Sequence, residues 1–269
     1  MWRLASDCLV PLEVGGTGRP LFCLHAVGGT VAYYAPVARR LGRLRDVYGL
    51  QCHGLRAGAQ ADPTIEEMAA RYVAAITEVQ SQGPYELIGY SMGGLIAAEM
   101  ARILRGRGEA VSLVGMLDTE PPCFREMTLT FEQTLGLLSR AVGLRSVFAA
   151  EPGRTRGQLL HDFRERAIAD GRVPKAFRIQ DLQPLVEIYE VNGAAISRYK
   201  PAPVPVDVDY LCTGRPDCPP DVLVEGWRGY VEGELRVFPL DADHFALMHE
   251  QHAGEVCAVI EGWLNREAP

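Results

Sequence analysis

Short apolar runs rich in branched residues alternate along this chain with longer segments of helical period, and this alternation constrains the fold more than any other feature. The predicted strands cover residues 21–25, 46–50, 85–90, 112–117, 206–212 and 234–240. Apolar residues spaced three and four apart predict helices over residues 31–41, 64–80, 92–105 and 254–265. Such alternation is typical of a mostly parallel sheet with helices on both faces, so the predicted class is α/β.

The strand pattern stops between Pro121 and Tyr199, and amphipathic stretches replace it. They lie near residues 130–142, 156–169 and 179–199. A helical insertion between strands, at about residues 121–200, is the simplest account. Its helices are separated by glycine- and proline-containing breaks. With 269 residues, the chain is expected to form a single domain that carries this insertion.

Charge and composition exclude several classes of function. The formal net charge is −7, Lys175 and Lys200 are the only lysines, and the arginines are scattered, so no basic stripe could follow a nucleic acid. No apolar run has a membrane-spanning length, and the first ten residues lack the apolar stretch of a signal peptide. The 7 cysteines form no zinc-like spacing. We therefore expect a cytoplasmic protein with free, mostly buried thiols and no metal site.

The motif that carries the most chemistry is Gly89-Tyr90-Ser91-Met92-Gly93, which lies directly between a predicted strand and a predicted helix. A serine on a tight strand-to-helix turn projects its hydroxyl out of the fold, and the flanking glycines leave room for that backbone. The turn also points the amide end of the helix at the site. We therefore predict Ser91 as a nucleophile and the Met92 amide as one donor to an oxyanion.

A second oxyanion donor is expected in the loop after an earlier strand, and residues 24–29, Leu-His-Ala-Val-Gly-Gly, fit that position. The paired glycines let backbone amides face a ligand. We favour the amide of Ala26. His25 is expected to orient this loop rather than act as the base, because it precedes the serine in the chain.

The general base should follow Ser91 in the chain, after the acid. His244 follows the predicted strand 234–240 in a loop at a strand end, where the site residues of such sheets gather, and it is the favoured base. His161 belongs to the helical insertion, and His249 and His252 lie at the start of the last helix.

Two aspartates can reach the histidine in sheets of this kind. Asp118 ends the predicted strand 112–117 directly, whereas Asp217 lies several residues into a Gly/Pro-rich loop. We favour Asp118 for its place at a strand end, and Asp217 and Glu120 remain alternatives.

At these residues the chain resembles the thioesterase domains that terminate nonribosomal peptide synthetases and related polyketide synthase assembly lines of secondary metabolite biosynthesis. The resemblance covers nearly the whole chain and rests on combined motifs. These are Val10-Pro11-Leu12, Leu21-Phe22-Cys23-Leu24-His25 with Gly28-Gly29, Gly83-Pro84-Tyr85 leading to Gly89-Tyr90-Ser91-Met92-Gly93-Gly94, Leu117-Asp118 before Pro121-Pro122, and Asp243-His244-Phe245.

This resemblance implies an α/β-hydrolase fold and adds to the choice of site residues. In that family the acid usually follows the strand after the nucleophile helix, which matches Asp118. The related editing thioesterases more often place the acid in the later loop and carry Gly-His-Ser-Met-Gly, where this chain has Tyr90. The family usually has proline after the first-loop histidine, and Ala26 stands there instead, so the second oxyanion donor is Ala26 or Val27.

The resemblance also implies a function. An acyl or peptidyl chain would arrive as a thioester on the phosphopantetheine arm of a partner carrier domain, and Ser91, His244 and Asp118 would release it through an acyl-enzyme. Water would give a free acid, and a group of the chain itself would give a ring. The domain would bind no cofactor of its own, the insertion would be a lid, and a monomer is expected. The rivals are a free-standing editing thioesterase or small-molecule esterase, and an inactive carrier-binding module.

Overall fold

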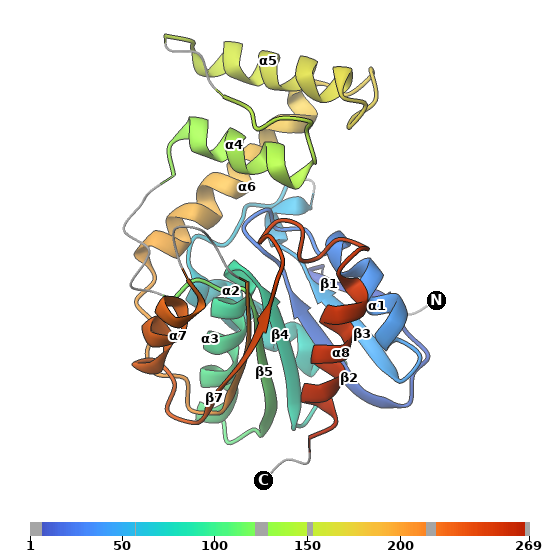
Figure 1. Ribbon diagram of the computed structural model, residues 1–269, viewed down its shortest axis with the longest axis vertical. Helices are drawn as coiled ribbons and strands as arrows, with labels where there is room; N and C mark the ends of the chain where they lie inside the picture. The colour runs from blue at the N-terminus through green and yellow to red at the C-terminus, as the bar shows by residue number, and fades with distance from the viewer. Residues whose placement is uncertain (1–6, 57, 122–128, 150–152, 214–218, 267–269) are drawn as a thin grey trace.

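A seven-stranded sheet runs through the centre of the computed structural model, which describes residues 7–56, 58–121, 129–149, 153–213 and 219–266 (Figure 1). The strands among these residues are β1 (Leu9–Glu13), β2 (Gly18–Leu24), β3 (Arg45–Leu50), β4 (Tyr85–Tyr90), β5 (Val111–Leu117), β6 (Val208–Thr213) and β7 (Leu235–Leu240). Their order is β1-β3-β2-β4-β5-β6-β7. Strand β1 pairs antiparallel with β3, and the other neighbours are parallel. The predicted α/β class is confirmed.

The sequence patterns did not predict β1. It carries Pro11 and ends on Glu13, and both residue types are uncommon inside strands. As an edge strand, β1 pairs on one side with β3 and leaves its other side unpaired in the sheet order, so a residue without an amide hydrogen is tolerated there. Helix α7 (Pro220–Arg228), which lies between β6 and β7, was also not predicted.

Helices cover both faces of the sheet (Figure 1). Along β2, Leu21 and Cys23 face one apolar cluster while Phe22 and Leu24 face the other, as the two-residue period of a strand requires. Helices α1 (Ala35–Leu41) and α8 (Ala253–Leu264) belong to the first cluster. Helices α2 (Ile65–Thr77), α3 (Met92–Gly106) and α7 belong to the second. Two short 3-10 turns, Ala32–Tyr34 and His53–Leu55, complete this part of the chain. No helix of the described part is both long and apolar enough to cross a bilayer.

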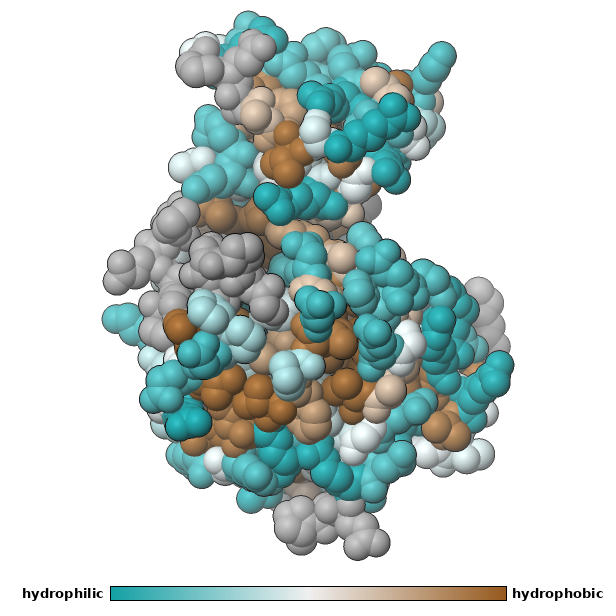
Figure 2. Space-filling view, in the orientation of Figure 1, coloured by the Kyte–Doolittle hydropathy of each residue, from teal (hydrophilic) through white to brown (hydrophobic). Residues whose placement is uncertain are grey.

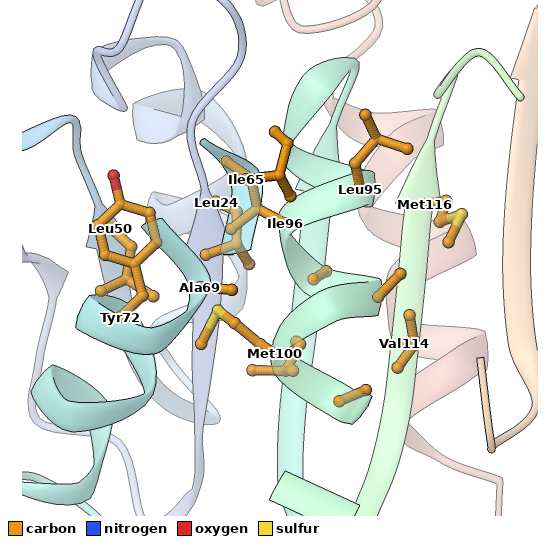
Figure 3. Packing of buried hydrophobic residues seen from close by; sticks show 14 of the residues in the cluster. Leu24, Leu50, Ile65, Ala69, Tyr72, Leu95, Ile96, Met100, Val114 and Met116 are labelled. Atoms are coloured by element: carbon orange, nitrogen blue, oxygen red, sulfur yellow. The ribbon is translucent and has the colours of Figure 1, made fainter. Parts of the chain in front are cut away.

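Helix α3 packs tightly between α2 and the sheet, and this packing fixes the position of its first residues (Figure 3). Leu95, Ile96 and Met100 of α3 are at most 1% exposed. Burying each large apolar side chain stabilises the fold by about 1.5–3 kcal/mol. The start of α3 therefore lies on a rigid platform.

Between β5 and β6, three described helices form a separate layer above the sheet (Figure 1). They are α4 (Phe131–Ala141), α5 (Arg156–Ala169) and α6 (Ile179–Arg198), within the predicted insertion at residues 121–200. The layer has its own apolar core, which includes Leu135, Phe163 and Val186. Capping boxes begin α4 at Thr130 and α5 at Thr155. A notch on one side of the molecule separates this layer from the sheet domain (Figure 2).

The register of the parallel strands brings several strand ends to one edge of the sheet. Leu24 pairs with Gly89, Tyr90 pairs with Leu117, and Leu117 pairs with Leu211. The carboxyl ends of β2, β4, β5 and β6 therefore lie side by side, beneath the α4–α6 layer (Figure 1). In parallel sheets this edge is where ligands bind.

Candidate active site

Ser91 lies at the sharp turn between β4 and α3. Its φ of 55° and ψ of −123° lie outside the regions that a residue with a side chain readily adopts, at a cost of about 1–3 kcal/mol. The Ser91 amide donates a hydrogen bond to the Leu117 carbonyl oxygen (2.9 Å), which ties the turn to the neighbouring strand. The surrounding fold thus holds the serine in a strained, outward-facing position.

The glycines on either side of the serine are required by close backbone approaches. A Cβ atom on Gly89 would lie 2.0 Å from the carbonyl carbon of Gly93, and one on Gly93 would lie 2.4 Å from the Leu24 carbonyl oxygen. Neither position could hold a larger residue without moving backbone. The spacing of G-x-S-x-G therefore follows from the crossing of helix and strand in this turn.

His244 and Asp118 lie in direct contact although they are 126 residues apart. His244 Nδ1 donates to Asp118 Oδ2 at 2.5 Å. Asp118 is 1% exposed, and it also accepts hydrogen bonds from the Thr213 amide (2.9 Å) and the Thr213 hydroxyl (2.8 Å). Burial alone would raise the pKa of Asp118, but the hydrogen bonds and charge of His244, together with Thr213, hold it below its ordinary value. The carboxylate is thus kept ionised beside the imidazole.

Tyr90 supports the histidine from the strand that carries the serine. Its hydroxyl donates to the His244 carbonyl oxygen (2.5 Å), and its ring stacks on the imidazole with centroids 5.1 Å apart. The Phe245 ring meets the His244 imidazole edge-on, with ring centroids 5.1 Å apart. The guanidinium carbon of Arg140, on α4, lies 5.0 Å from the centroid of the Phe245 ring. From the sequence alone, Tyr90 stood out only as the residue that replaces the histidine of the Gly-His-Ser-Met-Gly motif. Its proximity to His244 could be seen only in the folded chain.

The loop after β2 is ordered by hydrogen bonds that involve His25. This residue is fully buried, which lowers its pKa to about 4 and keeps it neutral. Because the Ala26 carbonyl oxygen only accepts, His25 Nδ1 must donate to it (2.8 Å), and Nε2 then accepts from the Tyr72 hydroxyl (2.7 Å). The geometry agrees with an orienting role for His25.

The Ala26 amide, which the sequence favoured as an oxyanion donor, already has an acceptor within the protein. It donates to the Tyr33 hydroxyl at 2.6 Å. The alternative donor, Val27, is the next residue in the same loop and lines the cavity beside Ser91. Met92, the other predicted donor, is the first residue of α3 and is 3% exposed.

A cavity of about 270 Å³ joins these parts beneath the α4–α6 layer. Its lining is mostly apolar and aromatic and comes from the first loop, the serine turn, α4, α6 and the His244 loop. Among the lining residues are Ala26, Val27, Tyr33, Tyr90, Ser91, Leu137, Tyr189, His244 and Met248. Ser91 and His244 therefore open onto one space, which is enclosed in part by the inserted helices.

The other candidates lie elsewhere or outside the described residues. His161 is exposed on α5, His252 precedes α8 and approaches Glu255 (3.3 Å), and His249 lines the cavity. Glu120 lies two residues beyond Asp118, and Asp217 lies outside the described residues. The described cysteines, which are Cys8, Cys23, Cys52, Cys212 and Cys257, are buried, and none is bonded to another of these five. The described residues also contain no group of three or more side chains placed to hold a metal ion.

Comparisons with known proteins point to one family. A family model described as thioesterase domain matches residues 19–264. The dimodular nonribosomal peptide synthase of Bacillus subtilis (strain 168) is 30% identical over 270 residues, covering 97% of this chain and 11% of that protein. The nonribosomal peptide synthetase btyA of Aspergillus terreus is 30% identical over 268 residues, covering 94% of this chain and 29% of that protein. The chain thus spans less than a third of either relative.

Solved structures share the fold. A four-domain nonribosomal peptide synthetase, in its holo form bound to AMP and glycine, matches with a TM-score of 0.86 and 25% identity, covering 97% of this chain and 20% of that chain. The NocB thioesterase domain, in a covalent complex with a fluorophosphonate nocardicin G analogue, matches with a TM-score of 0.66 and 24% identity, covering 93% of this chain and 96% of that one. The chain belongs to the thioesterase domain family.

Proposed function

We propose that this domain is a serine thioesterase that releases an acyl or peptidyl chain from the phosphopantetheine arm of a carrier domain. One observation carries the proposal. Ser91, on its strained turn, opens onto the same cavity as His244, which donates to the buried Asp118 carboxylate at 2.5 Å. A nucleophile, a base and an orienting acid in this arrangement are the parts that acyl transfer requires.

The hydrogen bond to Asp118 sets the protonation pattern of His244. With Nδ1 carrying the proton that Asp118 accepts, Nε2 of the neutral imidazole is unprotonated and can accept a proton. His244 would then take the hydroxyl proton of Ser91 as its oxygen attacks the thioester carbonyl carbon. The charged imidazole, stabilised by Asp118, would give that proton to the departing thiol of the phosphopantetheine arm.

The oxyanion of the tetrahedral intermediate would be held by two backbone amides. Met92 supplies one from the start of α3, where the helix dipole also favours negative charge. For the second we propose Val27 in place of Ala26, because the Ala26 amide is already bonded to Tyr33. The acyl-enzyme would be released by water or by a nucleophile of the chain itself.

Several features support carrier-bound substrates. Both relatives described above are nonribosomal peptide synthetases by name, and the chain covers 11% and 29% of them. In this proposal the partner is a carrier domain, in the same polypeptide or a separate one, and the domain binds no cofactor. The insertion at residues 121–200 would act as a lid, because Leu137 of α4 and Tyr189 of α6 line the cavity above Ser91.

The proposal is tested with a panel of peptidyl and acyl thioesters presented on pantetheine and on a carrier domain, beside simple aryl esters. Mass spectrometry of the products identifies the substrate class and separates free acids from rings. Ser91→Ala should abolish acyl-enzyme formation, while Ser197→Ala, which alters a hydroxyl bonded within α6, should retain it. Preference for short aryl esters would favour an esterase. Failure of Ser91 to react with a fluorophosphonate probe would favour an inactive carrier-binding module.

A further inference from the structure

Helix α6 is in direct contact with the loop that follows β2. A Cβ atom on Gly28 would lie 2.8 Å from the Tyr189 hydroxyl oxygen, and one on Gly29 would lie 2.9 Å from Ile188 Cγ2. Both contacts leave no room for a side chain between helix and loop. The inserted layer therefore packs directly on the loop of residues 25–29, here called the oxyanion loop because it contains the proposed donor Val27, in addition to covering the cavity.

One polar contact joins the same two segments. Asn192 of α6 is fully buried, and its Nδ2 donates to the Val27 carbonyl oxygen at 2.8 Å. A carbonyl oxygen can only accept, so the amide nitrogen must face it. The other amide atom, Oδ1, is buried and has no hydrogen-bond partner in the described part of the chain. An apolar residue at this position would leave the Val27 carbonyl without this donor, so the buried amide serves the loop that follows β2.

The contacts on either side of Val27 fix the direction of its amide. The Ala26 carbonyl oxygen accepts from His25 Nδ1 (2.8 Å) and from the Gly29 amide (2.9 Å). Since the peptide unit is planar and trans, holding that carbonyl points the Val27 N–H to the opposite side. Asn192 holds the carbonyl of the following peptide unit. Together these bonds set the rotation of the chain on both sides of the Val27 Cα atom.

We propose that Asn192 is a positioning residue that couples the placement of α6 to the geometry of the oxyanion site, an inference that rests on the function proposed above. Donors aimed at a developing charge act only when they are held in place, and a displacement of about 1 Å can cost about 100-fold in rate. When α6 sits on the loop, Asn192 completes the site. When α6 is displaced, the Val27 carbonyl loses its donor and the oxyanion loop loses its packing. The inserted layer that covers the substrate cavity therefore also controls how well the oxyanion site is formed.

The test compares two variants of α6. Asn192→Leu keeps the side-chain size and removes the donor. Tyr199→Phe is the matched control, because the Tyr199 hydroxyl anchors the end of the same helix to buried Glu99 (3.0 Å) and does not touch the oxyanion loop. The measurements are kcat and KM on a pantetheine-bound acyl thioester, acylation and deacylation rates of Ser91, thermal unfolding, and amide hydrogen exchange of the segment that contains residues 26–29.

We expect Asn192→Leu to lower kcat by about 10- to 100-fold with KM changed by less than about twofold, because the lost contribution arises in the transition state. Acylation and deacylation should slow together, since each passes through an oxyanion. Exchange in the 26–29 segment should speed up in Asn192→Leu and not in Tyr199→Phe.

A kcat within about twofold of the wild type in Asn192→Leu, or equal losses in both variants, would overturn the coupling. Failure of the wild-type protein to form an acyl-enzyme would instead refute the proposed function. In that case the exchange comparison still decides whether Asn192 orders the loop, and unchanged exchange would reject the inference.

Discussion

Replacing Asp118 with asparagine tests the central contact of the site. Asp118 accepts a hydrogen bond from His244 Nδ1 through Oδ2 and hydrogen bonds from Thr213 through both oxygens. In Asp118→Asn, Oδ1 can still accept from the Thr213 amide, which places the new NH₂ group at the former Oδ2 position. That group donates, so it faces a lone pair on Nδ1 and moves the imidazole proton to Nε2. His244 then cannot accept the proton of Ser91.

The expected loss follows from this change of tautomer. In Ser-His-Asp sites the same substitution costs about 10⁴-fold in kcat, which corresponds to about 5 kcal/mol of transition-state stabilisation. The fold should change much less. Removing a charge from a site that is 1% exposed relieves desolvation, while two charge-assisted hydrogen bonds from Thr213 weaken. These effects oppose one another, so we expect the free energy of unfolding to change by less than about 3 kcal/mol.

The assay is the single-turnover rate of Ser91 acylation by a pantetheine-bound acyl thioester, with denaturant unfolding measured in parallel. Thr213→Val is the matched control. It removes one hydrogen bond to Asp118 but keeps the carboxylate and the imidazole, so its rate should fall by less than about tenfold. If Asp118→Asn acylates Ser91 within about threefold of the wild type, Asp118 does not orient His244 and the acid must be sought elsewhere.

Three further expectations concern the residues around Ser91, His244 and Asp118. Tyr33→Phe leaves the Ala26 amide without its acceptor and should destabilise the fold by about 1–2 kcal/mol in chemical denaturation. Ala26→Pro in the Tyr33→Phe background removes the orphaned donor and should recover this loss. If the effects of the two substitutions on the free energy of unfolding simply add, the Ala26–Tyr33 pairing is contradicted. The unfolded chain protonates His25 near its ordinary pKa of 6.5 and the folded protein only near about 4. Acidification through that window therefore favours unfolding, and wild-type stability should fall by about 3 kcal/mol more than that of His25→Gln between pH 7 and pH 3. Tyr90→Phe removes the bond to the His244 carbonyl and should lower kcat by about 5- to 50-fold with little change in KM; an unchanged kcat would show that ring stacking alone positions the histidine.

The sequence by itself determined the class of fold and the parts of the site that depend on local pattern. Strand and helix periods are short-range properties, so the elements that surround Ser91 were predicted within a few residues of their observed ends. The strained serine turn was also visible, because the motif that forms it is contiguous and Gly89 is required by a contact with Gly93, four residues along the chain. The edge strand β1 and helix α7 were not. Pro11 interrupts the strand pattern of β1, and α7 has only 9 residues, too few for a clear helical period.

Tertiary structure decided the relations between residues that are distant in sequence. Asp118 and His244 meet because β5, β6 and β7 lie side by side in register, and no local pattern encodes that alignment. The donor to the Val27 carbonyl is Asn192, which is 165 residues away on α6. Each such contact depends on how whole elements pack, and packing energy is distributed over many side chains. The sequence could therefore propose Ser91, His244 and Asp118 as candidate catalytic groups, while only the folded chain shows which neighbours hold them in place.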